Sequence, residues 1–107
     1  PSKDANVVIY GALEDKDHLH MAPIILQHFN KIIISRPGTF KKSDLQKLFS
    51  IFEALKAESR STASIFLIED NSQALEKAYM LKGEDGAILV CGSFYLGGGI
   101  AEALKRR

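Results

Sequence analysis

Four short apolar runs, separated by stretches with helical periodicity, constrain the fold of this sequence more than any other feature. The runs cover residues 6–10, 31–35, 63–68 and 86–91. Each is almost continuously apolar and rich in β-branched residues. Strands have this composition when helices cover both faces of a parallel sheet. The pattern predicts an α/β domain of the three-layer, Rossmann-like kind, with a mainly parallel sheet of at least four strands and helices on both faces.

Each run is followed by a segment with the three- and four-residue apolar spacing of a helix. Ser43 and Gln46 form a capping box, which predicts that one helix begins at Ser43. A further helix is predicted from about Asn71, with Gly83 as its C-cap, and a last one from Leu96 or Gly97 to the end of the chain. The residues predicted to face the core are Leu45, Leu48, Phe49, Phe52 and Leu55 in the first of these helices, Ala74, Leu75, Ala78 and Tyr79 in the second, and Ile100, Ala101 and Leu104 in the last.

Two starting points fit the helix that follows the first run. Asp17 is a suitable N-cap, but Pro23 would then lie past the first turn and kink the helix. A start near Met21 would instead place Pro23 close to the first helical position, where proline is favoured.

Composition restricts the chain to one globular domain over residues 1–107, with 46% hydrophobic and 25% charged residues. No apolar run approaches the ~18 residues of a membrane span. The net charge is +1 and the basic residues are scattered, apart from residues 105–107, so a nucleic-acid interface is not expected. The single cysteine, Cys91, lies in an apolar run and is expected to be a buried, inert thiol. It excludes an internal disulfide and fits the cytoplasm.

Right-handed crossovers would place the carboxyl ends of all four strands along one edge of the sheet, where open α/β sheets bind ligands. The loop from Gly92 to Gly99 follows the last strand. Gly92 permits a sharp turn, and Ser93 would present a hydroxyl beside backbone N–H groups at a helix N-terminus, which suits a carboxylate or a phosphate. The alternative is a glycine-rich turn in which Ser93 is only a helix cap. The loop is not a Walker motif, since Gly98 and Gly99 occupy the positions of its lysine and its serine or threonine.

The loop after the first strand, residues 11–18, is the second candidate at this edge. Asp15 or Asp17 would receive a cation or a hydroxyl and Lys16 would hold an anion; a solvated turn capped by Asp17 is equally compatible. His18 completes this cluster, but on a helix it points away from His20, so no metal site is expected. A third loop, residues 36–39, offers Arg36 to an anion, although a plain turn is favoured there.

Two segments resemble the folylpolyglutamate synthase and dihydrofolate synthase family. Residues 8–17, VIYGALEDKD, are similar to its strand and G-A-L-x-D-K-D loop, and residues 88–96, ILVCGSFYL, to its closing V-x-G-S-x-Y-L segment. Between them, Arg36-Pro37 and Ile68-Glu69-Asp70 follow in the family's order. The resemblance therefore covers nearly the whole chain.

The resemblance implies an ADP-forming amide ligase of the Mur ligase superfamily. In this family a P-loop domain binds ATP and Mg²⁺ and phosphorylates the γ-carboxylate of a folate. The C-terminal domain closes over the site and helps to place L-glutamate, whose amine attacks the acyl phosphate; dihydrofolate synthases use dihydropteroate as the acceptor. Ser93, next to Gly92, matches a serine implicated in glutamate binding, and Asp15, Lys16 and Asp17 match the D-K-D loop.

Several parts of the family pattern are missing from these 107 residues, namely the P-loop domain, the opening strand and the D-G-A-H-N-P turn. Asp15 and His18 imitate the spacing of that turn, but they belong to the next loop, so its roles are not transferred. The expectation is a C-terminal domain or truncated segment that is inactive alone. It is also expected to self-associate through an unpaired sheet edge or an uncovered face.

Two other readings come from different classes of protein. The first is a stand-alone, flavodoxin-like module that binds an anion or a nucleotide without catalysis. The second, a receiver domain, is disfavoured because Ser35, Asp70 and Cys91 do not supply an acidic cluster at the strand ends. Fold alone does not separate these readings.

Overall fold

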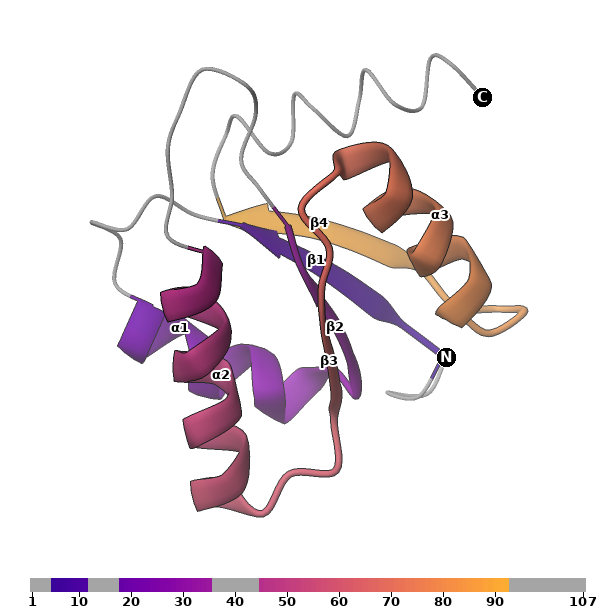
Figure 1. The fold of residues 1–107 in the computed structure, drawn as a ribbon. Coiled ribbons are helices and arrows are strands. Elements are labelled where there is room, and N and C mark those ends of the chain that lie inside the picture. The colour runs from indigo at the N-terminus through magenta and orange to yellow at the C-terminus, as the bar shows by residue number, and fades with distance from the viewer. Residues whose placement is uncertain (1–4, 12–17, 36–44, 93–107) are drawn as a thin grey trace.

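The strands form one parallel sheet in the computed structural model, which describes residues 5–11, 18–35 and 45–92 (Figure 1). The strands are β1 (Val7–Gly11), β2 (Lys31–Ile34), β3 (Ser64–Leu67) and β4 (Ile88–Gly92), in the order β3-β2-β1-β4. All three pairings are parallel, and β1 runs beside β4 with Val7 opposite Ile88. The predicted parallel sheet is confirmed.

In the described part of the chain, three helices cover the two faces of this sheet. Figure 1 shows α1 (His18–His28) and α2 (Leu45–Ser59) on one side and α3 (Asn71–Leu81) on the other. Alternate residues of β1 supply the two faces, because side chains alternate along a strand. Val8 and Tyr10 belong to the cluster under α1 and α2, whereas Val7 and Ile9 belong to the cluster under α3. The three-layer architecture predicted from the apolar runs is confirmed, and both faces being covered explains why those runs do not alternate.

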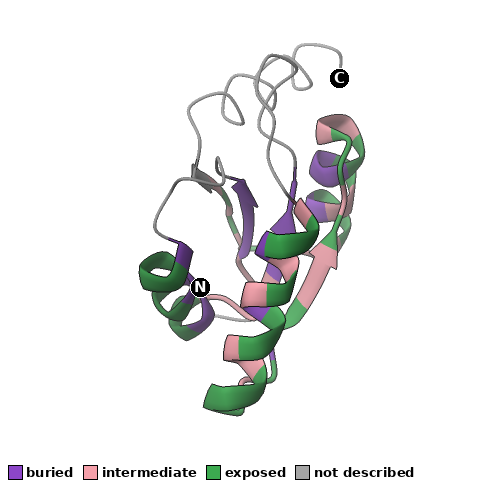
Figure 2. Ribbon diagram, turned by 60° about the vertical axis from the view of Figure 1, so that its left-hand side comes forward, coloured by how far each residue is buried: buried purple, intermediate pink, exposed green. Residues whose placement is uncertain are grey.

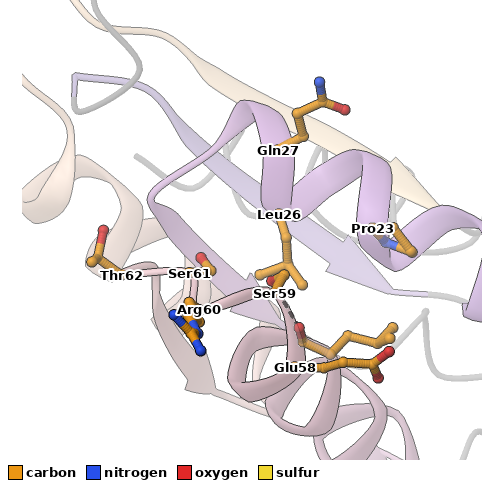
Figure 3. A pocket seen from close by; sticks show the side chains of 9 residues that line it. Pro23, Leu26, Gln27, Glu58, Ser59, Arg60, Ser61 and Thr62 are labelled. Atoms are coloured by element: carbon orange, nitrogen blue, oxygen red, sulfur yellow. Dashed lines mark hydrogen bonds between the residues drawn. The ribbon is translucent and has the colours of Figure 1, made fainter.

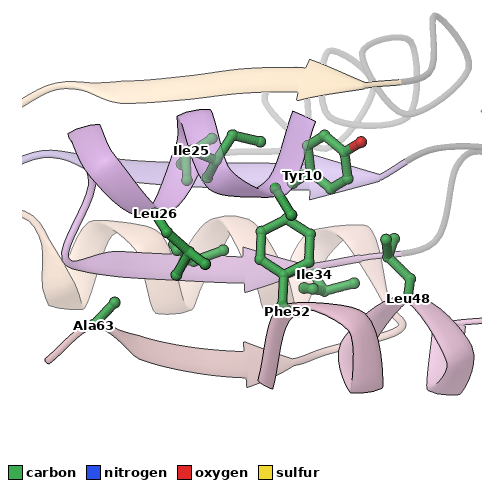
Figure 4. Packing of buried hydrophobic residues seen from close by; sticks show 10 residues of the cluster. Tyr10, Ile25, Leu26, Ile34, Leu48, Phe52 and Ala63 are labelled. Atoms are coloured by element: carbon green, nitrogen blue, oxygen red, sulfur yellow. The ribbon is translucent and has the colours of Figure 1, made fainter. Parts of the chain in front are cut away.

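The larger core cluster lies between the sheet and the α1–α2 layer (Figure 4). Phe52 of α2 is fully buried, and its ring centroid lies 5.3 Å from that of Tyr10 on β1. Aromatic rings at this separation gain energy beyond their burial. Figure 2 shows that the helices are buried on the sides that face the sheet and exposed on their outer sides.

Helix α1 already includes residue 18, so the early one of the two predicted starts is correct and Pro23 lies inside the helix. Pro23 is exposed, so its ring projects from the solvent side, where a missing backbone N–H costs least. Asp17 and Ser43, the two predicted caps, and the predicted last helix lie outside the described residues.

Helix α3 departs from the prediction at Tyr79 and at its C-cap. Its core contacts are Ala74, Leu75 and Ala78, but Tyr79 is exposed, so its predicted burial is wrong. A helix turns by 100° per residue, and the three smaller residues already fill the narrow strip that α3 presents to the sheet. Asp70 is the N-cap, and its carboxylate accepts the N–H of Gln73 at 3.0 Å.

The sequence predicts Gly83 as the C-cap of α3, and this prediction is wrong. The cap is Lys82, in an extended conformation with φ of −70°, and its N–H donates to the Ala78 carbonyl. Gly83 instead allows a close approach to Ala5, because a Cβ at Gly83 would lie 2.9 Å from the Ala5 Cβ. Its N–H donates to the Ala5 carbonyl at 2.9 Å, which ties the chain entering β1 to the turn before β4.

The C-terminus of α2 ends in a Schellman motif with an arginine in the left-handed position. Arg60 has φ of 57°, its N–H donates to Ala57 O at 3.3 Å, and the next N–H, that of Ser61, donates to Lys56 O at 3.0 Å. Glycine usually occupies this position because it has no Cβ to clash with the following carbonyl.

Arg60→Gly is therefore expected to raise the free energy of unfolding by about 0.5–1 kcal/mol, since relief of the strained backbone outweighs the extra entropy of glycine in the unfolded chain. Urea denaturation measures the change. Arg60→Ala is the matched control, because it removes the same side chain and keeps the strain. An equal gain in both variants would contradict the backbone explanation.

Candidate functional site

The carboxyl ends of the four strands form one row along the edge of the sheet. Gly11, the last residue of β1, lies opposite Gly92, the last residue of β4. On the other side of β1, the N–H of Ser35 donates to the Tyr10 carbonyl at 2.9 Å. The N–H of Ile68 then donates to the Ile34 carbonyl at 2.9 Å, which extends the row to the end of β3.

All three loops that the sequence singles out begin at this row. Residues 12–17 follow Gly11, residue 36 follows Ser35, and residue 93 follows Gly92. Because Gly11 and Gly92 are register partners on adjacent parallel strands, the two family-like motifs start about 4.8 Å apart. Asp15, Lys16, Asp17, Arg36 and Ser93 themselves lie outside the described residues, and Gly92 is described by its backbone alone.

His18, the described member of the first loop's cluster, is a buried residue beneath the edge of the sheet. It is the first residue of α1, and its Nδ1 lies 3.1 Å from the Tyr10 hydroxyl oxygen, within hydrogen-bond distance. The two rings meet edge-to-face at 6.0 Å. The imidazole therefore anchors the start of α1 to β1 at the point where the first loop returns to the core. His20 is exposed, so the two histidines point apart, as the sequence predicts.

Ser35 fixes a second part of the edge, and sequence reasoning missed this role. The residue is fully buried, and its hydroxyl lies 3.0 Å from Asn71 Oδ1 and 3.4 Å from the Glu69 carbonyl oxygen. These contacts join the end of β2 to the turn between β3 and α3. The sequence feature that could have indicated this role is a hydroxyl-bearing residue directly after three isoleucines, at the end of a predicted parallel strand.

Small residues and helix starts make this edge suitable for an anion. The row ends in Gly11 and Gly92, and a residue without a Cβ permits close approach to its backbone. Helices α1 and α3 both begin on this side of the sheet, and helix N-termini carry partial positive charge. At the start of α3, the Asp70 carboxylate already accepts a hydrogen bond from the N–H of Gln73. The geometry therefore favours a carboxylate or phosphate near β1 and β4.

A cleft of about 630 Å³ lies elsewhere, between α1 and the end of α2 (Figure 3). Pro23 and Leu26 line it from α1, and the turn from Ser59 to Thr62 lines it from the other side. That turn leads into the start of β3, so the cleft lies toward the amino edge of the sheet, away from the row of strand ends. None of the residues singled out as ligand-binding candidates contributes to it.

Two further searches cover the described part of the chain. Within it, no group of three or more His, Cys, Asp and Glu side chains is arranged to hold a metal ion. No described helix has the length and hydropathy of a membrane span.

Comparisons with known proteins are informative for solved structures. No protein-family model matches the sequence, and no curated protein matches it. Among solved structures, the chain is similar to the crystal structure of folylpolyglutamate synthase from Thermotoga maritima, with 20% sequence identity and a TM-score of 0.71. The similarity covers 97% of this chain and 22% of that one, so the chain spans about a fifth of the length of that enzyme. The resemblance drawn from the two motifs is thus confirmed in the fold: almost the whole chain has the fold of a segment of folylpolyglutamate synthase.

Proposed function

We propose that this chain is the C-terminal, substrate-closing domain of an ATP-dependent amide ligase that adds L-glutamate to a folate, as folylpolyglutamate synthases do. The observation that carries the proposal is the pairing of Gly11 with Gly92. Because of this pairing, the D-K-D loop after Gly11 and the glycine-rich loop after Gly92 begin on neighbouring strands. They begin at the edge where α/β sheets bind ligands. The fold match over 97% of the chain supports the same assignment.

In this proposal the two loops bind the amino acid. The Ser93 hydroxyl and the backbone N–H groups beside it hold a carboxylate of glutamate, and Lys16 adds a positive charge on the same edge. Asp15 and Asp17 are suited to the ammonium group of the incoming amino acid. The chain thereby orients the glutamate amine toward the activated carboxylate of the acceptor, which is a folate or, in a dihydrofolate synthase, dihydropteroate.

The chain's residues do not fit the ATP site of such an enzyme. The sequence contains no G-x-x-x-x-G-K-[ST] motif, and its glycine-rich loop has Gly98 and Gly99 where that motif has its lysine and hydroxyl residue. ATP and Mg²⁺ therefore belong to a P-loop domain of the parent enzyme, which is the partner this domain closes on. The contribution of this chain is to bind and orient glutamate.

Ser93→Ala in the full-length parent enzyme is expected to raise the KM for glutamate by roughly one to two decades, with a smaller change for ATP. The loss of one hydrogen bond to a charged group costs about 1.5–3 kcal/mol. Steady-state kinetics with each substrate varied in turn measure both constants. Ser50→Ala, at an exposed position of α2, is the matched control and should change neither. An unchanged glutamate KM in Ser93→Ala would reduce Ser93 to a helix cap and remove the proposed carboxylate site.

A further inference from the structure

The cleft between α1 and the end of α2 combines apolar and polar lining residues (Figure 3). Leu26 is 5% exposed and Leu55 is half-buried, and both line the cleft together with Pro23. We call these three residues the apolar floor. The volume of about 630 Å³ is in the range of small-molecule sites, which pair apolar surface with a few polar groups that orient the ligand.

The end of α2 offers this cleft less negative charge than a free helix end would. A helix C-terminus carries partial negative charge on its last carbonyl groups, and this charge would oppose an anion. Three of these carbonyls accept hydrogen bonds from residues 59–61. The acceptors and their donors are Leu55 O with Ser59 Oγ at 2.8 Å, Lys56 O with the Ser61 N–H at 3.0 Å, and Ala57 O with the Arg60 N–H at 3.3 Å.

Three consecutive residues, Arg60, Ser61 and Thr62, bring hydrogen-bond donors to the polar side of the cleft. Ser61 Oγ accepts the N–H of Ala63 at 3.1 Å, so its hydroxyl hydrogen is left to donate to another group. The side chains of Arg60 and Thr62 are exposed. A guanidinium beside two hydroxyl groups suits a carboxylate, which it binds through two parallel N–H···O bonds.

The backbone of Arg60 gives an independent reason to assign this side chain a role. Its φ of 57° lies in the left-handed region, where glycine would be relaxed and an arginine is strained. Strained residues of this kind cluster at ligand sites, where the surrounding structure holds them. An arginine in this conformation at the mouth of a cleft therefore favours a binding role for its guanidinium.

Glu58 also lines the cleft, and its carboxylate would repel an anion at short range. Figure 3 shows Glu58 and Arg60 on opposite sides of Leu26. An anion that binds at Arg60 therefore lies away from Glu58.

We propose that this cleft binds a small organic anion, with its carboxylate held by Arg60, Ser61 and Thr62 and a compact apolar body packed on the apolar floor. An inorganic anion would leave the apolar floor in contact with water. The site is separate from the glutamate site of the proposed function, because the cleft lies toward the amino edge of the sheet and that site at the strands' carboxyl ends. The inference does not depend on the ligase reaction.

Phenylacetate is a suitable probe, and proton–nitrogen NMR spectra of the 107-residue chain follow its binding residue by residue at low ionic strength. Phenylacetamide and phenethylamine keep the ring and replace the carboxylate by a neutral and a cationic group. We expect phenylacetate to shift the amides of Leu26, Leu55 and Ser61 with a Kd of about 1 mM, in keeping with the few atoms that it brings into contact. Phenylacetamide should bind about 10-fold more weakly, because hydrogen bonds to a charged group are stronger.

Arg60→Gly separates binding from folding. The variant is expected to be more stable, because it relieves the left-handed strain, and yet to bind phenylacetate about 10-fold more weakly, no better than phenylacetamide. Arg60→Lys keeps the charge but not the two parallel bonds, and it should retain part of the preference for phenylacetate. Lys47→Ala removes an exposed basic side chain of α2 outside the cleft and is the control, which should change neither affinity.

Any of four results would overturn the inference. The first is that phenylacetate leaves the cleft amides unshifted, including the case in which only Gly11 and Gly92 respond and the anion binds at the strand ends. The second is equal affinity for the three probes, which would show an apolar pocket without a preference for charge. The third is tighter binding of phenethylamine, which would make Glu58 the dominant group. The fourth is undiminished binding of phenylacetate by Arg60→Gly.

Discussion

Phe52→Ala is expected to lower the free energy of unfolding by about 3–5 kcal/mol, the usual cost of truncating a buried phenylalanine to alanine. Phe52 is fully buried between α2 and the sheet, and its ring packs against Tyr10 and within the cluster that includes Ile34 and Leu48 (Figure 4). The substitution removes these contacts and leaves a cavity where three elements meet. Urea denaturation followed by circular dichroism measures the loss.

Phe49→Ala is the matched control for Phe52→Ala, since it makes the same change three residues earlier in α2, at a position that is only half-buried. It should cost less than half as much, because less apolar surface returns to water. Equal losses at the two positions would mean that the core is not organised around the Tyr10–Phe52 contact.

The sheet could be predicted from the sequence because a parallel strand that is buried on both faces is a continuous run of apolar residues. Residues 31–34 are buried or half-buried along their whole length, and this is what a continuous run of isoleucines indicates. The ends of the helices were predicted less well. Gly83 looks like a left-handed cap by residue type, but it is required by the approach of Ala5, a contact across the fold that residue type does not record.

The candidate site shows the same division between local and tertiary information. The two glycine-containing motifs were found from the sequence, because each lies within a few residues of a strand end. Their pairing through Gly11 and Gly92 is a matter of strand order, which the alternation of elements does not determine. The contacts of His18 with Tyr10 and of Ser35 with Asn71 also needed the structure, since they join residues that lie 8 and 36 positions apart.

The second large effect concerns catalysis. The 107-residue chain is expected to form no ADP from ATP under any combination of substrates. Phosphoryl transfer depends on groups that position the phosphates and Mg²⁺, and this sequence has no P-loop. The chain alone should nevertheless remain folded, because its described residues already form a buried apolar cluster on each face of the sheet. Its inactivity would then reflect missing chemistry and not unfolding, and circular dichroism of the same sample checks this.

ADP formation by the complete polypeptide tests the central proposal most directly. The enzyme is supplied with ATP and Mg²⁺, with L-glutamate, and with a folate or dihydropteroate, and each substrate is omitted in turn. We predict that ADP forms only when all are present, that one glutamate is added to the acceptor for each ADP released, and that the 107-residue chain gives none in parallel assays. ADP formation that does not depend on glutamate and on either acceptor, or glutamate-dependent ADP formation by the 107-residue chain alone, would contradict the assignment.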